Sequence, residues 1–183
     1  MRRALTITET LLCASIIGLL LGVAGLGVDT VRQDLKRRQT ENLLAILDRA
    51  LTAYQQAAGK WPANSSADER RSSLSEDDGS GSRIVGALAA VPESLKVLDH
   101  VPSIFRMEPA QGVSQAVTQP WAGIRDAWGR PLCCLTADCT SPSDAEALAA
   151  NGGKPIFISA GPDGLFGRQD PSAAADNLRS DGR

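Results

Sequence analysis

The residues best suited to chemistry lie near the C-terminal end of the chain, where oxygen-bearing side chains follow a glycine-rich turn. A strand predicted to end at Ser159 runs into Gly-Pro-Asp-Gly, whose aspartate is Asp163, and Asp170, Asp176 and Asn177 follow. Calcium binds roughly six to eight oxygen atoms, and glycines let a loop turn its carbonyl groups inward. The pattern suits a calcium site, although Asp-Gly and Asp-Pro are also common in plain turns.

Cysteines form a second group with chemical potential. Cys133, Cys134 and Cys139 occur in the segment CCLTADC, whereas Cys13 lies in an apolar N-terminal segment. In an oxidising compartment one of the adjacent pair can bond to Cys139, and we predict the bond between Cys134 and Cys139, with Cys133 as the alternative partner. A zinc site competes with this interpretation, but it lacks a second ligand pair, and the single histidine, His100, is distant in sequence.

A carboxylate, Glu9, stands near the start of an apolar segment of membrane length. No charged residue occurs between Glu9 and Asp29, and residues 11–28 are all apolar or small. With the residues before it, this segment is long enough as a helix to cross roughly 30 Å of hydrocarbon. An ionisable group at the edge of such a span is costly unless it lies near the headgroups or meets a cation.

The N-terminal sequence RRALTITETLLCASIIGLLLGVAGL resembles the class III signal of type IV pilins and type II secretion pseudopilins. In that family a basic leader ends in a small residue, and glutamate is the fifth residue after the cut. The resemblance implies cleavage by a prepilin peptidase between Ala4 and Leu5, where the family usually has Gly and Phe. It also implies that Glu9 pairs with the new ammonium group at Leu5 of a neighbouring subunit. An ordinary secretory signal peptide and an uncleaved anchor are the alternatives.

Two internal segments are similar to the same family. The segment YQQAAGKWP, residues 54–62, resembles the end of the long helix in major pseudopilins. There Gly59 would permit the reversal of the chain and Trp61 would pack back onto the helix. The segment DAWGRP, residues 126–131, resembles the family's Asp-x-Trp-Gly-x-Pro turn, in which Trp128 would cap the core.

The C-terminal loop of major pseudopilins carries a calcium ion. The resemblance therefore implies Ser159, Asp163 and Asp170 as ligands in this chain. Pro171 stands where the family often has a second adjacent acid, so Asp176 is the expected substitute.

Periodicity and the resemblance together predict the order of the elements. Residues 1–4 are the expected leader, residues 5–28 a transmembrane helix, and residues 29–62 its amphipathic continuation and turn. The apolar stripe of that continuation should pack against the domain's own sheet rather than in a coiled coil, and it consists of Leu35, Leu43, Leu47, Leu51 and Tyr54.

Residues 63–183 are expected to form one globular domain that begins with a mobile polar loop at residues 63–83. The remaining predicted elements are a short amphipathic helix at Ile84–Leu98, strands at Ser103–Met107, Pro131–Leu135 and Pro155–Ser159, and a helix at Ser143–Ala150.

The composition and residue spacing argue against two classes of function, nucleic-acid binding and catalysis. The chain has 183 residues, a net charge of −2 and a pI of about 5.4, so it has no basic field for nucleic acid. It also has no spacing typical of a catalytic triad or phosphate loop, and we therefore expect no enzyme.

The resemblance implies an α+β, pilin-like fold, in which a long N-terminal helix packs on a small antiparallel sheet. It further implies a structural subunit of a periplasmic filament, the pseudopilus of a type II secretion system, anchored once in the bacterial inner membrane. The expected partners are further copies of the chain, other pseudopilins, the prepilin peptidase and the inner-membrane assembly platform. A type IV pilus or minor pilin subunit is one alternative, and a membrane-anchored metal-binding or interaction module is another.

Overall fold

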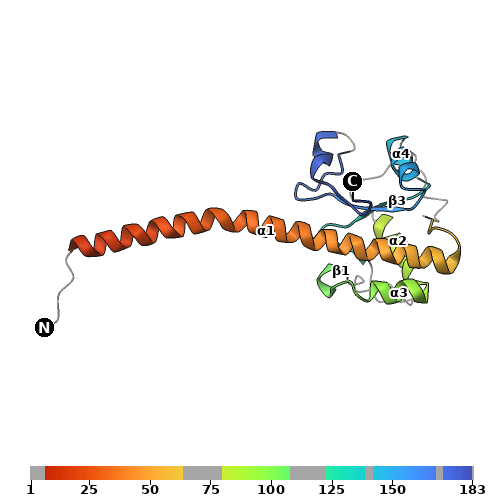
Figure 1. Ribbon diagram of the computed structural model, residues 1–183, viewed down its shortest axis with the longest axis horizontal. Helices are drawn as coiled ribbons and strands as arrows, with labels where there is room; N and C mark the ends of the chain where they lie inside the picture. The colour runs from red at the N-terminus through yellow and green to blue at the C-terminus, as the bar shows by residue number, and fades with distance from the viewer. Residues whose placement is uncertain (1–6, 64–79, 108–122, 139–141, 168–170, 183) are drawn as a thin grey trace, which may run out of the picture. The chain divides into compact units, whose positions relative to one another are not determined.

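A computed structural model describes residues 7–63, 80–107, 123–138, 142–167 and 171–182. These residues form helices and two small antiparallel sheets, so the fold class is α+β (Figure 1). The chain divides into two compact units, residues 1–36 and residues 37–183.

Helix α1 (Ile7–Ala58) has 52 residues and carries Glu9 in its first turn. It ends where the sequence predicted: Gly59 adopts a φ of 71°, and its N–H donates to the carbonyl of Gln55 at 2.9 Å. The expected start at Leu5 lies outside the described residues. Within the described part of the chain, no helix combines the length and the hydropathy that crossing a membrane requires.

In the first unit, the large apolar side chains whose burial is described, those in residues 7–19 and 29–36, are exposed. The exposed ones are Ile7, Leu11, Leu12, Ile16, Ile17, Leu19, Val31 and Leu35. Leu35 was expected in the buried stripe, and that prediction is wrong, because 54% of its surface is exposed. The first buried residue of α1 among those described is Thr40, which belongs to the second unit.

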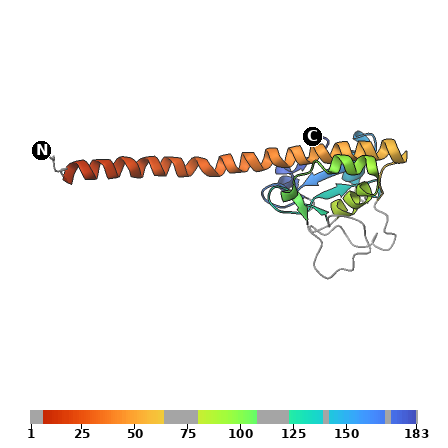
Figure 2. The ribbon, with the colours of Figure 1, turned by 90° about the horizontal axis from the view of Figure 1, so that it is seen from below.

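In the second unit, the part of α1 from residue 37 onward supplies one side of the core. Leu43, Leu47 and Leu51 are buried, and Tyr54 and Trp61 pack partly buried against the same cluster. Figure 2 shows this part of the helix lying along one side of the strands. Each fully buried leucine contributes about 1.5–3 kcal/mol. The predicted packing within the domain and the predicted contact of Trp61 are therefore confirmed.

The helix predicted at residues 84–98 is two helices, α2 (Ser80–Ala89) and α3 (Pro92–Leu98). Val91, which precedes Pro92, is extended, with φ −106° and ψ 121°. A residue before proline is pushed out of the helical region, and proline fits the first turn of a new helix. The predicted loop at 63–83 is also wrong at its end, because Ser80 and Gly81 are buried at the start of α2. Residues 64–79 lie outside the described part.

The strands form two antiparallel sheets. A 3-10 helix, η1 (Ser103–Phe105), precedes β1 (Arg106–Met107), which pairs with β2 (Gly123–Ile124). The larger sheet has the order β3-β4-β5, formed by β3 (Cys133–Leu135), β4 (Ile156–Ser159) and β5 (Leu178–Arg179). The strands predicted near residues 133 and 156 are confirmed, whereas only the end of the segment 103–107 is a strand.

Helix α4 (Pro142–Ala150) confirms the predicted helix and begins one residue earlier. Gly152 and Gly153 end it with φ values of 67° and 76°. The chain then returns to α1, because the ammonium group of Lys154 lies 2.6 Å from the carboxylate of Asp48. A second 3-10 helix, η2 (Pro171–Asp176), precedes β5.

Candidate functional site

The predicted cation loop leaves β4 through two glycines in left-handed conformations. Gly161 has a φ of 62° and Gly164 a φ of 81°, and the N–H of Gly164 donates to the carbonyl of Ala160 at 3.1 Å. Asp163 is exposed, and its Oδ1 accepts a hydrogen bond from the N–H of Leu165 at 2.8 Å. A side-chain oxygen that bonds the backbone two residues on is typical of an aspartate that stabilises a turn.

Ser159 uses its hydroxyl inside the domain. The buried hydroxyl donates to Oδ2 of Asp126 at 2.7 Å and accepts from the N–H of Gly161 at 3.3 Å. The oxygen atom of this side chain is thus engaged in holding the loop to Asp126. The hydroxyl donates once and accepts once, so only one of its lone pairs remains for an ion.

Asp176 and Asn177 present oxygen atoms of a different kind. Oδ1 of each residue is buried and has no hydrogen-bond partner among the described residues. Asp176 lies against Gly161, since a Cβ atom on that glycine would meet the carboxyl carbon of Asp176 at 3.1 Å. Buried oxygens usually have a partner, and carboxylate and amide oxygens are ligands that calcium prefers. These two residues therefore fit a calcium ion.

The other predicted ligands are placed differently. Asp170 lies outside the described residues, and within the described ones no group of three or more His, Cys, Asp or Glu side chains gathers at one point. The amide nitrogen of Asn177 donates to the carbonyl of Phe166 at 3.2 Å, which fixes its orientation. Sequence reasoning did not assign Asn177 as a ligand, although its place beside Asp176 was a usable signal.

Asp126 supports the loop, and sequence reasoning missed its role. It is only 2% exposed, and its Oδ1 accepts hydrogen bonds from the N–H groups of Trp128 and Arg130, both at 2.9 Å. The N–H of Ala127 donates to the hydroxyl of Thr40 on α1 at 3.2 Å. The turn predicted from Asp-x-Trp-Gly is present, with Gly129 at a φ of 86° and Trp128 packed against the core.

Cys133 and Cys134 are buried on β3, and Ser80 of α2 contacts both. The N–H of Cys134 donates to the hydroxyl of Ser80 at 3.0 Å, and this hydroxyl lies 3.6 Å from the sulfur of Cys133. Cys139 lies outside the described residues, so the disulfide between Cys134 and Cys139 stays a prediction. Cys13 is exposed on α1.

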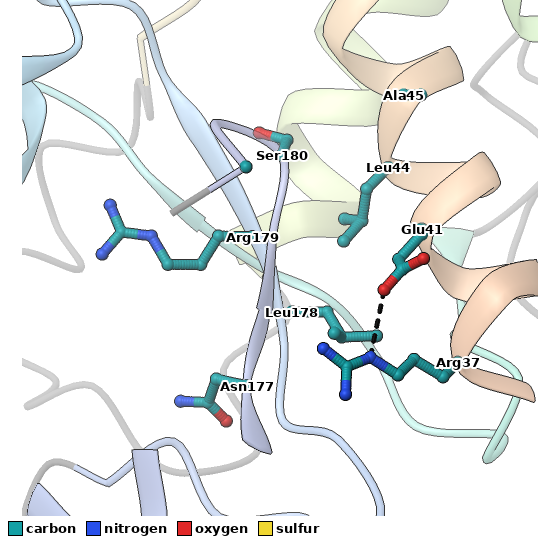
Figure 3. A pocket seen from close by; sticks show the side chains of 9 residues that line it. Arg37, Glu41, Leu44, Ala45, Asn177, Leu178, Arg179 and Ser180 are labelled. Carbon is teal, nitrogen blue, oxygen red and sulfur yellow. Dashed lines mark hydrogen bonds and ion pairs between the residues drawn. The ribbon is translucent and has the colours of Figure 1, made fainter. Parts of the chain in front are cut away.

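A groove of about 360 Å³ lies between α1 and β5 (Figure 3). Leu44 and Leu178 lie within it, and Arg37, Glu41 and Arg179 lie around it. The two arginines already have carboxylate partners: Arg37 contacts Glu41 at 3.1 Å, and Arg179 contacts Asp181 at 2.7 Å. The groove therefore presents no unpaired charge among these residues.

At the other end of the chain, Glu9 is exposed on the first turn of α1. Ala4 and Leu5, the predicted cleavage residues, lie outside the described part of the chain. No protein-family model, curated protein or solved structure matches the chain.

Proposed function

We propose that this chain is a structural subunit of a pilus-like filament, the pseudopilus of a type II secretion system. The observation that carries the proposal is the place of Glu9 in the first turn of α1, directly before a series of exposed apolar side chains. In a filament, this carboxylate would meet the N-terminal ammonium group of a neighbouring copy.

The exposed apolar side chains surround the helix rather than forming one stripe. Successive residues of a helix are rotated by about 100°, so Ile7 and Ile16 point to roughly opposite sides, and Leu12 and Ile17 point to two further directions. A helix that is apolar all round is covered by lipid or by other helices. Both coverings fit a filament subunit, which is held in the membrane before assembly and packed among other copies afterwards.

Glu9 would fix the axial offset between neighbouring copies of α1 in the filament. Cleavage between Ala4 and Leu5 would create an ammonium group at Leu5, four residues before the carboxylate in sequence. An ionised carboxylate is costly in hydrocarbon, and pairing with the ammonium of a neighbouring copy offsets that cost. The pairing requires two chains at a fixed axial offset, so it favours ordered assembly over simple anchoring.

The second unit supports a pilin-like fold for the exported part. The end of α1 packs with the core of a small α+β domain, and its last turn is stopped by Gly59 and covered by Trp61. The domain would lie in the periplasm, and the chain would be held in the inner membrane until the assembly platform and other pseudopilins incorporate it. Cleavage would require the prepilin peptidase.

The test compares the wild-type chain with Glu9→Ala and Glu9→Gln, and with Thr10→Ala as a matched control on the next residue. Membranes that contain the chain are treated with a crosslinker that does not react with amino groups. Crosslinked multimers are then separated from monomers by size. We expect wild type and Thr10→Ala to form multimers, and both Glu9 variants to stay in the membrane as monomers. Multimers of Glu9→Ala at the wild-type level would contradict the proposal.

The same experiment addresses the alternatives. Wild-type chain that remains monomeric would favour a membrane-anchored binding module. Filaments found on the cell surface rather than in the periplasm would favour a type IV pilus.

A further inference from the structure

Arg130 connects the turn at Asp126 to the C-terminal loop. Its backbone is fixed at both polar atoms, since its N–H donates to Oδ1 of Asp126 at 2.9 Å and its carbonyl accepts from the N–H of Asp126 at 2.8 Å. Asp126 also holds Ser159, the last residue of β4. The buried carboxylate of Asp126 therefore holds both the backbone of Arg130 and the residue from which the loop begins.

The guanidinium group of Arg130 lies inside the turn of the loop. Its Nη1 donates to the carbonyl of Gly161 at 2.9 Å. It also covers Gly164 so closely that a Cβ atom on that glycine would overlap Nη1 and Cζ. The second glycine of Gly-Pro-Asp-Gly is thus needed for its φ of 81° and for the approach of the guanidinium.

The charge of Arg130 has no carboxylate partner within the described residues. Its guanidinium group donates to a backbone carbonyl, that of Gly161, and its side chain forms no ion pair among those residues. A bound cation stabilises a glycine-rich loop by attracting its carbonyl oxygens. The positive charge of Arg130 attracts the carbonyl oxygen of Gly161 in the same way. Arginine keeps its charge at every physiological pH, so this cation is permanent.

We infer that Arg130 is a positioning residue that serves as a built-in cation of the C-terminal loop. It holds the half of the loop from Gly161 to Gly164 whether or not a divalent ion is bound near Asp176 and Asn177. Because like charges repel, the guanidinium also weakens the binding of a divalent cation to the same loop. This inference does not depend on filament assembly.

The first part of the test measures hydrogen exchange in the full-length chain in detergent micelles with EDTA. The variants are Arg130→Gln, which removes the charge, and Arg130→Lys, which keeps it. Arg125→Gln is the matched control, because Arg125 also donates one guanidinium hydrogen bond to a distant carbonyl, that of Ile104 at 3.0 Å. The reporter is the amide of Gly164, which donates to Ala160.

We expect Arg130→Gln to speed exchange at Gly164 by about tenfold, the effect of losing one charge-assisted hydrogen bond. Arg130→Lys should restore most of the protection, and Arg125→Gln should leave it unchanged. Unchanged exchange in Arg130→Gln would overturn the inference. So would equal loss in the Gln and Lys variants, because that result would mean that shape rather than charge matters.

The second part titrates calcium chloride and follows the melting temperature. Removing the guanidinium should make the loop more receptive, so calcium should act on Arg130→Gln at a concentration several-fold lower than on wild type or Arg125→Gln. An identical calcium response in all three chains would overturn the inference. If Arg130→Gln does not fold, Arg130→Lys decides: it should fold and retain slow exchange at Gly164, and failure to do so would overturn the inference.

Discussion

The carboxylate of Asp126 joins segments that lie far apart in the sequence. It holds Trp128 and Arg130 in its own turn and Ser159 at the end of β4. The next residue, Ala127, bonds to Thr40 of α1. The Asp126 side chain thus fixes the turn to the larger sheet, and the backbone of the next residue fixes the turn to the helix. The candidate loop begins two residues beyond Ser159, the most distant partner of Asp126.

Replacing Asp126 should therefore destabilise the domain strongly. Asp126→Ala leaves the donors of Trp128, Arg130 and Ser159 without their acceptor, and we expect it to lower the free energy of unfolding by about 3 kcal/mol. Asp126→Asn retains an acceptor for the two N–H groups and should cost about 1 kcal/mol. Urea unfolding followed by tryptophan fluorescence measures both. Equal stability of the Ala variant and wild type would show that the network contributes nothing.

The cysteines allow a second prediction. Protein recovered from an oxidising compartment should contain a disulfide between Cys134 and Cys139, since Cys139 lies close to both buried cysteines in sequence. Peptide mapping without reduction checks it. Cys134→Ser should abolish the cross-linked peptide, whereas Cys133→Ser should leave it intact. The opposite result would assign the bond to Cys133, and three free thiols in this segment would contradict the disulfide altogether.

The elements show which features local sequence can predict. The end of α1 at Gly59 and the turn of the Asp-x-Trp-Gly segment at Gly129 were both predicted, and each depends on the backbone freedom of a single glycine. The break at Val91 was missed, although Pro92 marks it, because apolar periodicity continues through the break. Short-range chemistry therefore outweighs periodicity where the two disagree.

The candidate site was less predictable for a physical reason. Ser159 was expected to bind an ion, but its hydroxyl is directed at Asp126, which lies in another segment. The buried oxygens of Asp176 and Asn177 and the reach of Arg130 into the loop also depend on contacts between distant segments. A single sequence shows which residues have suitable oxygen atoms, and only the fold shows which of those atoms are already bonded.

The loop between β4 and β5 gives the third prediction. If calcium binds there, EDTA should lower the melting temperature by roughly 5–10 °C when the ion had been present at about 100 times its dissociation constant. Asp176→Asn should remove most of this calcium-dependent shift, because it replaces a carboxylate oxygen that has no other partner. Glu93→Gln, at an exposed acid on α3, should leave the shift unchanged. A melting temperature that does not change when EDTA is added would indicate a plain turn without a bound ion.

For the molecule as a whole, the two units have opposite surfaces. The unit of residues 37–183 has a core of buried apolar side chains, whereas the large apolar side chains described in the unit of residues 1–36 are exposed. Exposed apolar surface of this kind marks a site of contact with lipid or protein. The first unit is therefore the part of the chain whose stability depends most on its surroundings. In the proposed function, these surroundings are lipid before assembly and other copies of the helix afterwards.

The proposed packing of α1 in a filament also requires cleavage of the chain after Ala4. This requirement gives the last prediction. Chain isolated from membranes of its native host should begin at Leu5, and its intact mass should be lower by the mass of residues 1–4. The new ammonium group would then belong to a residue four positions before Glu9, and the proposed assembly pairs it with Glu9 of another copy. Ala4→Gly, which introduces the family's usual residue, should preserve this processing, and Ala4→Arg should block it. A chain that begins at Met1 would indicate a simple anchor, and one that begins near Leu26 would indicate a secreted domain without Glu9. In either case no ammonium group would lie at Leu5 to pair with Glu9, and the proposed assembly would lose its physical basis.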